Sequence, residues 1–322
     1  MLIFSTNNNN KQMKLIKLLS IIALTAVFSQ ASLGQNNLKE RANVTVEKVN
    51  EKIVATTNQA GLTDDQKNAK PISITNIPVL NKWNGFDIIE FKFNGFDAKI
   101  VFPNQANPEK NWIWRTQFWG HEPQVDLALL NNGFHLVYID VIGLYGNAVA
   151  GERFNGFYSF LIKNFGLNKK TVLEGMSRGG LDAYNWASKN TDKVFCIYGD
   201  APVCDIKSWP GGLGKGEGSK DDWEKCLNAY GITALNVKEF KDIPIYNCVK
   251  LAEAKIPLLN VCGDIDTVVP MDENTTILAE TYRKAGGEIQ IIVKKGVGHH
   301  PHCLVDPKPI VDFILKNTII KR

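Results

Sequence analysis

A serine in a glycine-rich turn is the first residue whose surroundings indicate chemistry. Residues 175–180 read Gly-Met-Ser-Arg-Gly-Gly, and they follow the short apolar run 171–173. A strand, a tight turn and a helix in this order expose the serine hydroxyl, because the glycines two positions before and after it leave room where the backbones crowd. The pattern predicts that Ser177 is a nucleophile. It also predicts that the backbone N–H of Arg178 faces the oxyanion formed during attack.

A candidate acid and a candidate base follow the serine along the chain. The apolar run 257–262 leads into Gly-Asp-Ile-Asp-Thr-Val-Val-Pro, and the run 289–293 precedes Gly-Val-Gly-His-His-Pro-His. A neutral histidine can take the serine proton while an aspartate orients its ring. An ordinary histidine titrates at about pH 6.5, so we expect activity to fall on acidification. The candidates are Asp264 and Asp266 for the acid, and His299, His300 and His302 for the base.

The order Ser, Asp, His with these motifs resembles the α/β-hydrolase superfamily, within the group of exported bacterial esterases and prolyl-oligopeptidase-type hydrolases. The similarity extends over residues 86–317. It implies that Asp266, in a Gly-x-x-Asp-x-x-Val-Pro pattern, is the acid in preference to Asp264. It implies equally that His299, which follows a glycine, is the base. The resemblance predicts an α/β-hydrolase fold, with a mostly parallel central sheet, helices on both faces and a small cap insertion.

The hydrophobic pattern independently favours this architecture. Apolar runs of strand length alternate with helical patterns, which is typical of a parallel sheet covered by helices. The Asn94-Gly95 pair predicts a hairpin, so the sheet is expected to begin with antiparallel strands. Strands are expected at 86–93, 97–102, 133–141, 171–174, 194–198, 257–262 and 289–293, and helices at 123–130, 152–165, 178–189, 274–285 and 309–317.

The N-terminal residues are typical of a leader for export. Lys14 and Lys17 precede an apolar run from 18 to 28, and small residues follow as far as Gly34. This pattern predicts a signal peptide at 1–34, cleaved before Gln35, and an exported protein in the periplasm or outside the cell. Polar residues 35–80 are expected to be a linker, 81–322 the hydrolase domain, and 205–254 the cap insertion.

Several residues near the predicted site are candidates for substrate contacts. The second oxyanion donor is expected in the loop 103–114 that follows the strand 97–102, with the N–H of Trp112 as the candidate. Trp114 is expected to contact the flat face of a sugar or an aromatic acyl group, and Arg115 is expected to bind a carboxylate, although core packing is the favoured explanation for any single tryptophan. Asp200 ends a strand and is expected to contact substrate, to serve as an alternative acid, or to cap a turn. Trp209 lies in the expected cap.

Charge and composition exclude other classes of function. The 37 basic residues exceed the 33 acidic residues chiefly through three lysines in the leader, so nothing favours nucleic-acid binding. The Gly-Lys stretch 211–220 does not fit the GxxxxGK[ST] spacing of a P-loop, so it gives no reason to expect nucleotide binding. No cofactor is required for triad chemistry, and no metal is expected. The cluster His299, His300 and His302 lacks an HExxH helix and is interrupted by Pro301. The six cysteines permit pairing, with buried free thiols favoured at Cys196 and Cys262.

The sequence therefore predicts a serine hydrolase that cleaves a carboxylic ester, with an exported carbohydrate esterase of the acetylesterase type as the specific hypothesis. The expected partner is a small-molecule or glycan ester, with no membrane association after leader cleavage. A serine peptidase of the prolyl-oligopeptidase type is the first alternative, although 322 residues leave no room for the propeller that such enzymes normally add. A binding protein on a degenerate hydrolase fold is the second.

Overall fold

The structure, a computed structural model, describes residues 74–318. The predicted signal peptide and residues 35–73 of the predicted linker lie outside the described residues. None of the helices in 74–318 is long and apolar enough to cross a bilayer.

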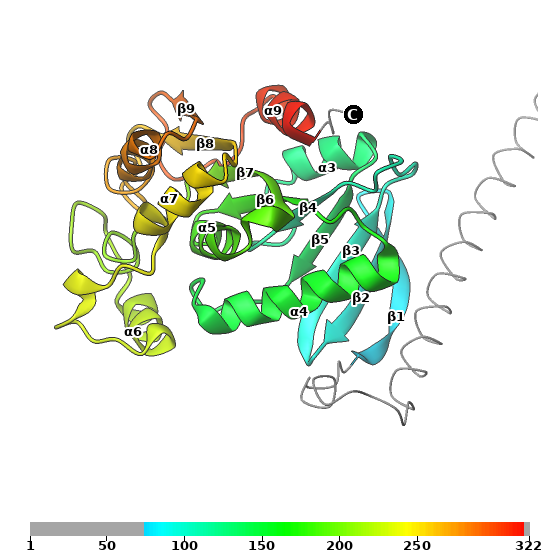
Figure 1. Cartoon of the computed structure of the whole chain (residues 1–322), viewed down its shortest axis with the longest axis horizontal. Helices are drawn as coiled ribbons and strands as arrows, with labels where there is room; N and C mark the ends of the chain where they lie inside the picture. Colours follow the sequence, from blue (N-terminus) through cyan, green and yellow to red (C-terminus); the bar gives the residue numbers. More distant parts are fainter. Residues whose placement is uncertain (1–73, 319–322) are drawn as a thin grey trace, which may run out of the picture. The chain divides into compact units, whose positions relative to one another are not determined.

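A nine-stranded sheet runs through the described part, in the order β1-β2-β3-β5-β4-β6-β7-β8-β9 (Figure 1). The first three strands and β5 pair antiparallel, and the rest of the sheet is parallel. The strands are β1 (Ile74–Trp83), β2 (Phe86–Phe93), β3 (Phe96–Phe102), β4 (Trp112–Arg115), β5 (His135–Ile139), β6 (Thr171–Met176), β7 (Val194–Asp200), β8 (Leu258–Gly263) and β9 (Ile289–Lys294). β1 and β9 are the two edge strands.

Two asparagine–glycine turns build the antiparallel end of the sheet. Asn84-Gly85 joins β1 to β2, and Asn94-Gly95 joins β2 to β3. All four residues have positive φ, between 48° and 88°. Two-residue turns of this type match the twist of the flanking strands, and Asn-Gly is the pair that adopts them most readily. The hairpin predicted at Asn94-Gly95 is therefore present, and a second one precedes it.

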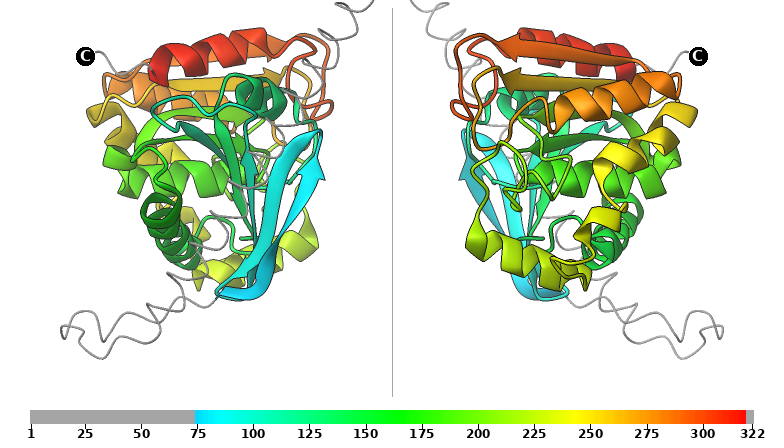
Figure 2. Two further views of the ribbon diagram at one scale, coloured as in Figure 1. Left: turned by 90° about the vertical axis from the view of Figure 1, so that its right-hand side faces the viewer. Right: turned by 90° about the vertical axis from the view of Figure 1, so that its left-hand side faces the viewer.

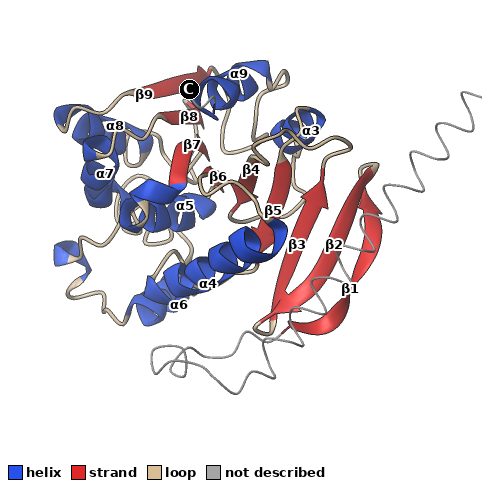
Figure 3. Ribbon diagram, turned by 45° about the vertical axis from the view of Figure 1, so that its right-hand side comes forward, coloured by secondary structure: helices blue, strands red, loops and turns tan. Residues whose placement is uncertain are grey.

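Helices cover both faces of the sheet (Figures 1 and 3). On one face, α3 and α9 pack over a buried apolar cluster that includes Val125, Val172 and Ile314. The views in Figure 2 show α9 and α8 on opposite sides of the last strands. The helices are α3 (Gln124–Asn131), α4 (Ala148–Phe165), α5 (Gly179–Lys189), α6 (Lys220–Tyr230), α7 (Pro244–Glu253), α8 (Thr275–Lys284) and α9 (Lys308–Thr318), with 3-10 turns at Thr191–Lys193 and Val237–Glu239.

Three features of the fold differ from those expected from the sequence. β1 begins at Ile74, inside the predicted linker, so the expected domain start near residue 81 falls within a strand. Pro78 interrupts the strand pattern and lies beside a register shift, which only an edge strand tolerates. β4 was expected to be part of a loop. Within the predicted cap, α7 is a crossover helix that packs against α5 and α8, so the insertion ends before Pro244.

Candidate active site

Ser177 occupies the sharp turn between β6 and α5, as predicted. Its φ is +48°, in the left-handed region that a non-glycine residue rarely adopts. The backbone N–H of Ser177 donates to the carbonyl of Asp200 at 2.8 Å, which ties the turn to the end of β7. A Cβ atom added at Gly179 would lie 2.8 Å from Thr116 Oγ1, so only glycine fits there without a shift.

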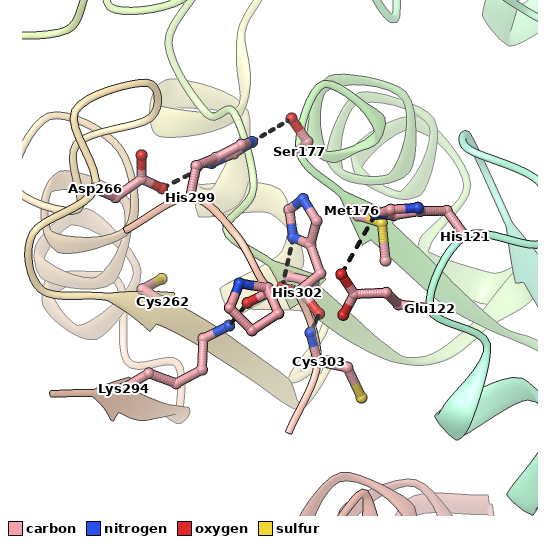
Figure 4. A network of polar contacts seen from close by, with 12 residues as sticks. His121, Glu122, Met176, Ser177, Cys262, Asp266, Lys294, His299, His302 and Cys303 are labelled. Carbon is pink, nitrogen blue, oxygen red and sulfur yellow. Dashed lines mark hydrogen bonds and ion pairs between the residues drawn. The ribbon is translucent and has the colours of Figure 1, made fainter. Parts of the chain in front are cut away.

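Ser177, His299 and Asp266 lie in one hydrogen-bonded line (Figure 4). Ser177 Oγ is 3.0 Å from His299 Nε2, and His299 Nδ1 is 2.8 Å from Asp266 Oδ2. The three residues follow β6, β8 and β9, whose carboxyl ends meet at one side of the parallel sheet. This arrangement allows the imidazole to receive the serine proton while the carboxylate stabilises the resulting cation.

The local backbone holds Asp266 in this position. Its Oδ1 accepts hydrogen bonds from the N–H groups of Val268 at 2.9 Å and Val269 at 2.8 Å, which leaves Oδ2 for His299. The alternative acid Asp264 is exposed, and its carboxylate accepts from Gly296 N and faces Lys295. The structure thus brings Asp266, and not Asp264, to the histidine.

The sequence profile of the prolyl oligopeptidase family matches residues 128–312, which is more than half of the chain. The chain belongs to the prolyl oligopeptidase family. No curated protein matches it in sequence. Membership of the family makes the chain a serine hydrolase, and the residues matched include Ser177, Asp266 and His299.

Solved structures share the α/β-hydrolase fold with this family member at low sequence identity. A puromycin-hydrolyzing peptidase from Mycobacterium tuberculosis is 14% identical, with a TM-score of 0.53 over 76% of this chain and 38% of that chain. An acylaminoacyl peptidase from Pyrococcus horikoshii is 16% identical, with a TM-score of 0.54 over 81% of this chain and 45% of that chain. Dipeptidyl peptidase 4 from Porphyromonas gingivalis is 14% identical, with a TM-score of 0.53 over 77% and 35%. The chain therefore spans less than half the length of these proteins.

Arg178 is the N-cap residue of α5, so its backbone N–H lies at the start of the helix beside Ser177, as predicted. The sequence patterns assign no role to the Arg178 side chain. The guanidinium lies 5.1 Å from the centre of the Phe118 ring and 5.9 Å from that of Trp209, and it faces Asp222 at 3.4 Å. A cation close to two partly exposed rings thus lies beside the nucleophile, and Trp209 is near the site as expected.

Trp112 is wrongly predicted as an oxyanion donor. It is fully buried at the amino end of β4, and its indole N–H donates to the carbonyl of Asn168 at 2.8 Å. The donor loop was placed after β3, but β3 is antiparallel to β5, so its carboxyl end lies at the opposite side of the sheet from Ser177. The loop that reaches the serine follows β4 instead.

Trp114 and Arg115 are also wrongly predicted as substrate contacts. Trp114 is 0% exposed and packs against Phe154 and Trp186, with ring centres 4.5 and 5.4 Å away. Arg115 is 1% exposed and forms ion pairs with Asp126 at 2.6 Å and Glu174 at 3.1 Å. Both side chains belong to the core because β4 is a central strand with helices on both faces.

The Asp200 side chain likewise faces the interior, and its carboxylate is hydrogen-bonded to residues outside the triad. Its carboxylate accepts from His302 Nδ1 at 3.0 Å, from the backbone N–H of Cys303 at 2.6 Å and from the Tyr198 hydroxyl. These contacts lower the pKa of Asp200, against the effect of burial. The predictions that it binds substrate, replaces the triad acid or caps a turn are wrong.

The loop after β4 carries residues that the sequence did not reveal. Gln117 is buried, and its amide donates to Asp182 Oδ2 of α5 at 3.0 Å, which fixes the loop against the nucleophile turn. Burial raises the pKa of Asp182 to about 7. Phe118 follows with a φ of +53°. This segment could have been found from the sequence only if residues 112–115 had been recognised as a strand.

The histidines after β9 have separate positions. His299 faces Ser177, whereas His300 and His302 face His121 from the loop after β4, and the imidazole nitrogens of these three lie within 4.8 Å of one another. Burial and the neighbouring imidazoles lower the pKa of His300. Figure 4 shows His302 between the His299 side and the His121 side of the site. All six cysteines are buried and free, including Cys196 and Cys262 as expected.

Proposed function

We propose that this serine hydrolase cleaves a carboxylic ester, with Ser177 as the nucleophile, His299 as the general base and Asp266 as the orienting acid. One observation carries the assignment, namely the continuous line from Ser177 Oγ through His299 to Asp266, with separations of 3.0 and 2.8 Å. Both separations are normal hydrogen bonds, so proton transfer requires no rearrangement of these side chains.

In the proposed reaction, His299 Nε2 removes the proton from Ser177 Oγ as this oxygen attacks the carbonyl carbon. The backbone N–H of Arg178 and an N–H from the Gln117–Phe118 segment stabilise the oxyanion. His299 then donates its proton to the departing alcohol oxygen and leaves an acyl group on Ser177. A water molecule, deprotonated by the same nitrogen, releases the acid and restores the serine.

We further propose a glycan ester as the substrate and export as the location. The substrate proposal is supported by Phe118 and Trp209, whose partly exposed rings lie near the Arg178 guanidinium beside the nucleophile and suit the flat face of a sugar. Trp114 and Arg115 no longer support it, since both are buried. The export proposal depends on the leader pattern at residues 1–34. N-terminal sequencing of protein recovered from the producing cells would test cleavage before Gln35.

A peptidase is the second candidate, favoured by the family profile and by the peptidases among the structural neighbours. Both candidates need the same triad, so substrate preference separates them. We suggest comparing acetate release from acetylated oligosaccharides with cleavage of aminoacyl and prolyl p-nitroanilides. Higher kcat/KM on the acetylated sugars would support the esterase, and the reverse order would support the peptidase.

The triad itself is tested with Ser177→Ala and with Ser159→Ala, a matched change on the exposed surface of α4. We expect Ser177→Ala to lose both hydrolysis of p-nitrophenyl acetate and labelling by a fluorophosphonate, and Ser159→Ala to keep both. Labelling that survives in Ser177→Ala would overturn the assignment of the nucleophile.

A further inference from the structure

A cluster of three histidines lies next to the triad and is not used by the proposed reaction. His121 comes from the loop after β4, whereas His300 and His302 come from the loop after β9. One imidazole nitrogen of each lies within 4.8 Å of the other two. His302 is 4% exposed, and the other two side chains are exposed. Within residues 74–318, no other set of three or more metal-ligating side chains comes together in this way.

The hydrogen bonds of His302 prepare it for metal binding. Its Nδ1 lies 3.0 Å from Asp200 Oδ1, and this buried aspartate is itself held by the N–H of Cys303 and the hydroxyl of Tyr198. The proton of a neutral His302 therefore resides on Nδ1, and the lone pair is on Nε2. Metal-ligating histidines almost always donate their other ring N–H to a carboxylate, a backbone carbonyl or water, and this partner fixes the tautomer and the ring orientation.

The triad histidine does not belong to the cluster. Both nitrogens of His299 are occupied, Nε2 by Ser177 and Nδ1 by Asp266. A carboxylate does lie beside the cluster, because Glu122 Oε1 is 3.5 Å from His121 Nε2 (Figure 4). Three imidazole nitrogens form a ligand set that suits zinc and related transition metals better than magnesium or calcium.

We propose that His121, His300 and His302 bind a divalent transition-metal ion of the zinc class. Zinc–nitrogen bonds of about 2.0–2.1 Å place tetrahedral ligand atoms about 3.3 Å apart, so the nitrogens must move inward by about 1 Å. His121 and His300 are exposed and can make this movement by side-chain rotation, while His302 stays fixed by Asp200.

The ion would connect the two loops that border Ser177. The turn that carries His121 is held by the buried Arg115, whose guanidinium donates to the carbonyls of Phe118 and His121. The His302 ring centre is 4.8 Å from that of His299. Metal binding would therefore fix the loop that presents the general base, and the three histidines would act as positioning residues in addition to their role as ligands.

The experiment measures zinc binding to the full-length protein after treatment with a chelator, by isothermal titration calorimetry with zinc chloride and by the absorption spectrum of the cobalt(II) form. We expect one ion per chain and tetrahedral cobalt bands. His121→Ala and His300→Ala change exposed side chains, so they should fold normally and weaken binding at least about 10-fold. Asp264→Asn, an exposed acid on a neighbouring loop, is the matched control and should bind like the wild type.

Ser177→Ala separates this inference from the proposed function, because it removes hydrolysis and should leave zinc affinity unchanged. A wild-type protein that binds no stoichiometric zinc would overturn the proposal. So would zinc affinity that is unchanged in both His121→Ala and His300→Ala, since the ion would then lie elsewhere. Binding lost in these two variants and kept in Asp264→Asn would establish the site.

Discussion

Arg115 and Asp126 form a 2.6 Å ion pair in which the two side chains are 1% and 0% exposed. Glu174 of β6 joins the same guanidinium at 3.1 Å, so one buried cation connects α3, β4 and β6. Arg115 also donates to the carbonyl of Phe118 at 3.2 Å. The cluster thus supports the loop beside the nucleophile from inside the core.

We predict that the two carboxyl groups of this cluster contribute unequally to stability. Burial raises the pKa of Glu174 well above its ordinary value, so Glu174→Gln should lower the free energy of unfolding by only about 1 kcal/mol. Asp126→Asn should lower it by about 3–5 kcal/mol, because Arg115 keeps its charge in a buried site and loses the nearer of its two carboxyl partners. Urea unfolding at pH 7 measures both values. Equal losses in the two variants would contradict this account.

A second prediction concerns the triad acid. In Asp266→Asn, Oδ1 can still accept from Val268 and Val269, so the amide N–H₂ would face His299 Nδ1. The histidine would then carry its proton on Nε2, the nitrogen that must accept from Ser177. We expect kcat for p-nitrophenyl acetate to fall by about 10⁴-fold, as for the equivalent change in chymotrypsin-like proteases.

Asp264→Asn is the control for this change, since Asp264 lies in the same loop but faces Gly296 and Lys295. Its kcat should stay within about twofold of the wild type, as is usual for surface substitutions. A large loss in Asp264→Asn with little loss in Asp266→Asn would reverse the assignment of the acid.

Glycine substitutions should have opposite effects at two positions. An added Cβ at Gly179 would lie 2.8 Å from Thr116 Oγ1 and 3.1 Å from Gln117 Cβ, so Gly179→Ala should destabilise by about 1–3 kcal/mol and reduce kcat. Gly151 lies in α4 with no atom within 4 Å of such a Cβ, and Gly151→Ala should stabilise by about 0.5–1 kcal/mol. Thermal unfolding and initial rates measure both. A stabilised, fully active Gly179→Ala variant would show that the loop and the turn are not in close contact.

The buried acid Asp182 predicts how stability depends on pH. Its pKa is about 7 in the folded protein and about 3.9 in an unfolded chain, so the folded state binds more protons between these values. The contribution of this group to the free energy of unfolding is therefore fully present below about pH 4 and decreases as the pH rises to 7. Asp182→Asn should remove this decrease, which amounts to at least about 1.4 kcal/mol.

Urea unfolding at pH 5 and pH 8 measures the effect, with the exposed Asp192→Asn as the control. The difference in unfolding free energy between the two pH values should shrink in Asp182→Asn and stay at the wild-type value in Asp192→Asn. An unchanged difference in Asp182→Asn would mean that this carboxyl group does not titrate in the window.

The sequence predicted most of the fold because its local signals agree with one another. Seven strands and five helices were placed close to their observed bounds, and the Ser, Asp, His order identified three side chains that the structure brings together. β4 was not predicted because its four residues are all buried, so no alternation of apolar and polar residues indicates a strand. The wrong assignments of Trp112, Trp114 and Arg115 all follow from treating residues 112–115 as part of a loop.

His121 could not be associated with His300 and His302 from the sequence, because a long stretch of chain separates them and only the order of the parallel strands brings the loops together. The burial of Asp200 could not be predicted either, because it also depends on how distant loops pack together. A residue that ends a strand can face the site or the core, and the packing of the His302 loop over β7 decides which.

The position of β9 at the end of the sheet also affects how the protein behaves in concentrated solution. The strand reads Ile-Gln-Ile-Ile-Val-Lys and is an edge strand of the sheet formed by the described residues, and edge strands rich in β-branched residues pair readily with copies of themselves. Charged residues lie at both ends, with Glu288 before the strand, Lys294 as its last residue and Lys295 after it. These charges act as gatekeepers against aggregation, so surface engineering of this protein should leave them in place.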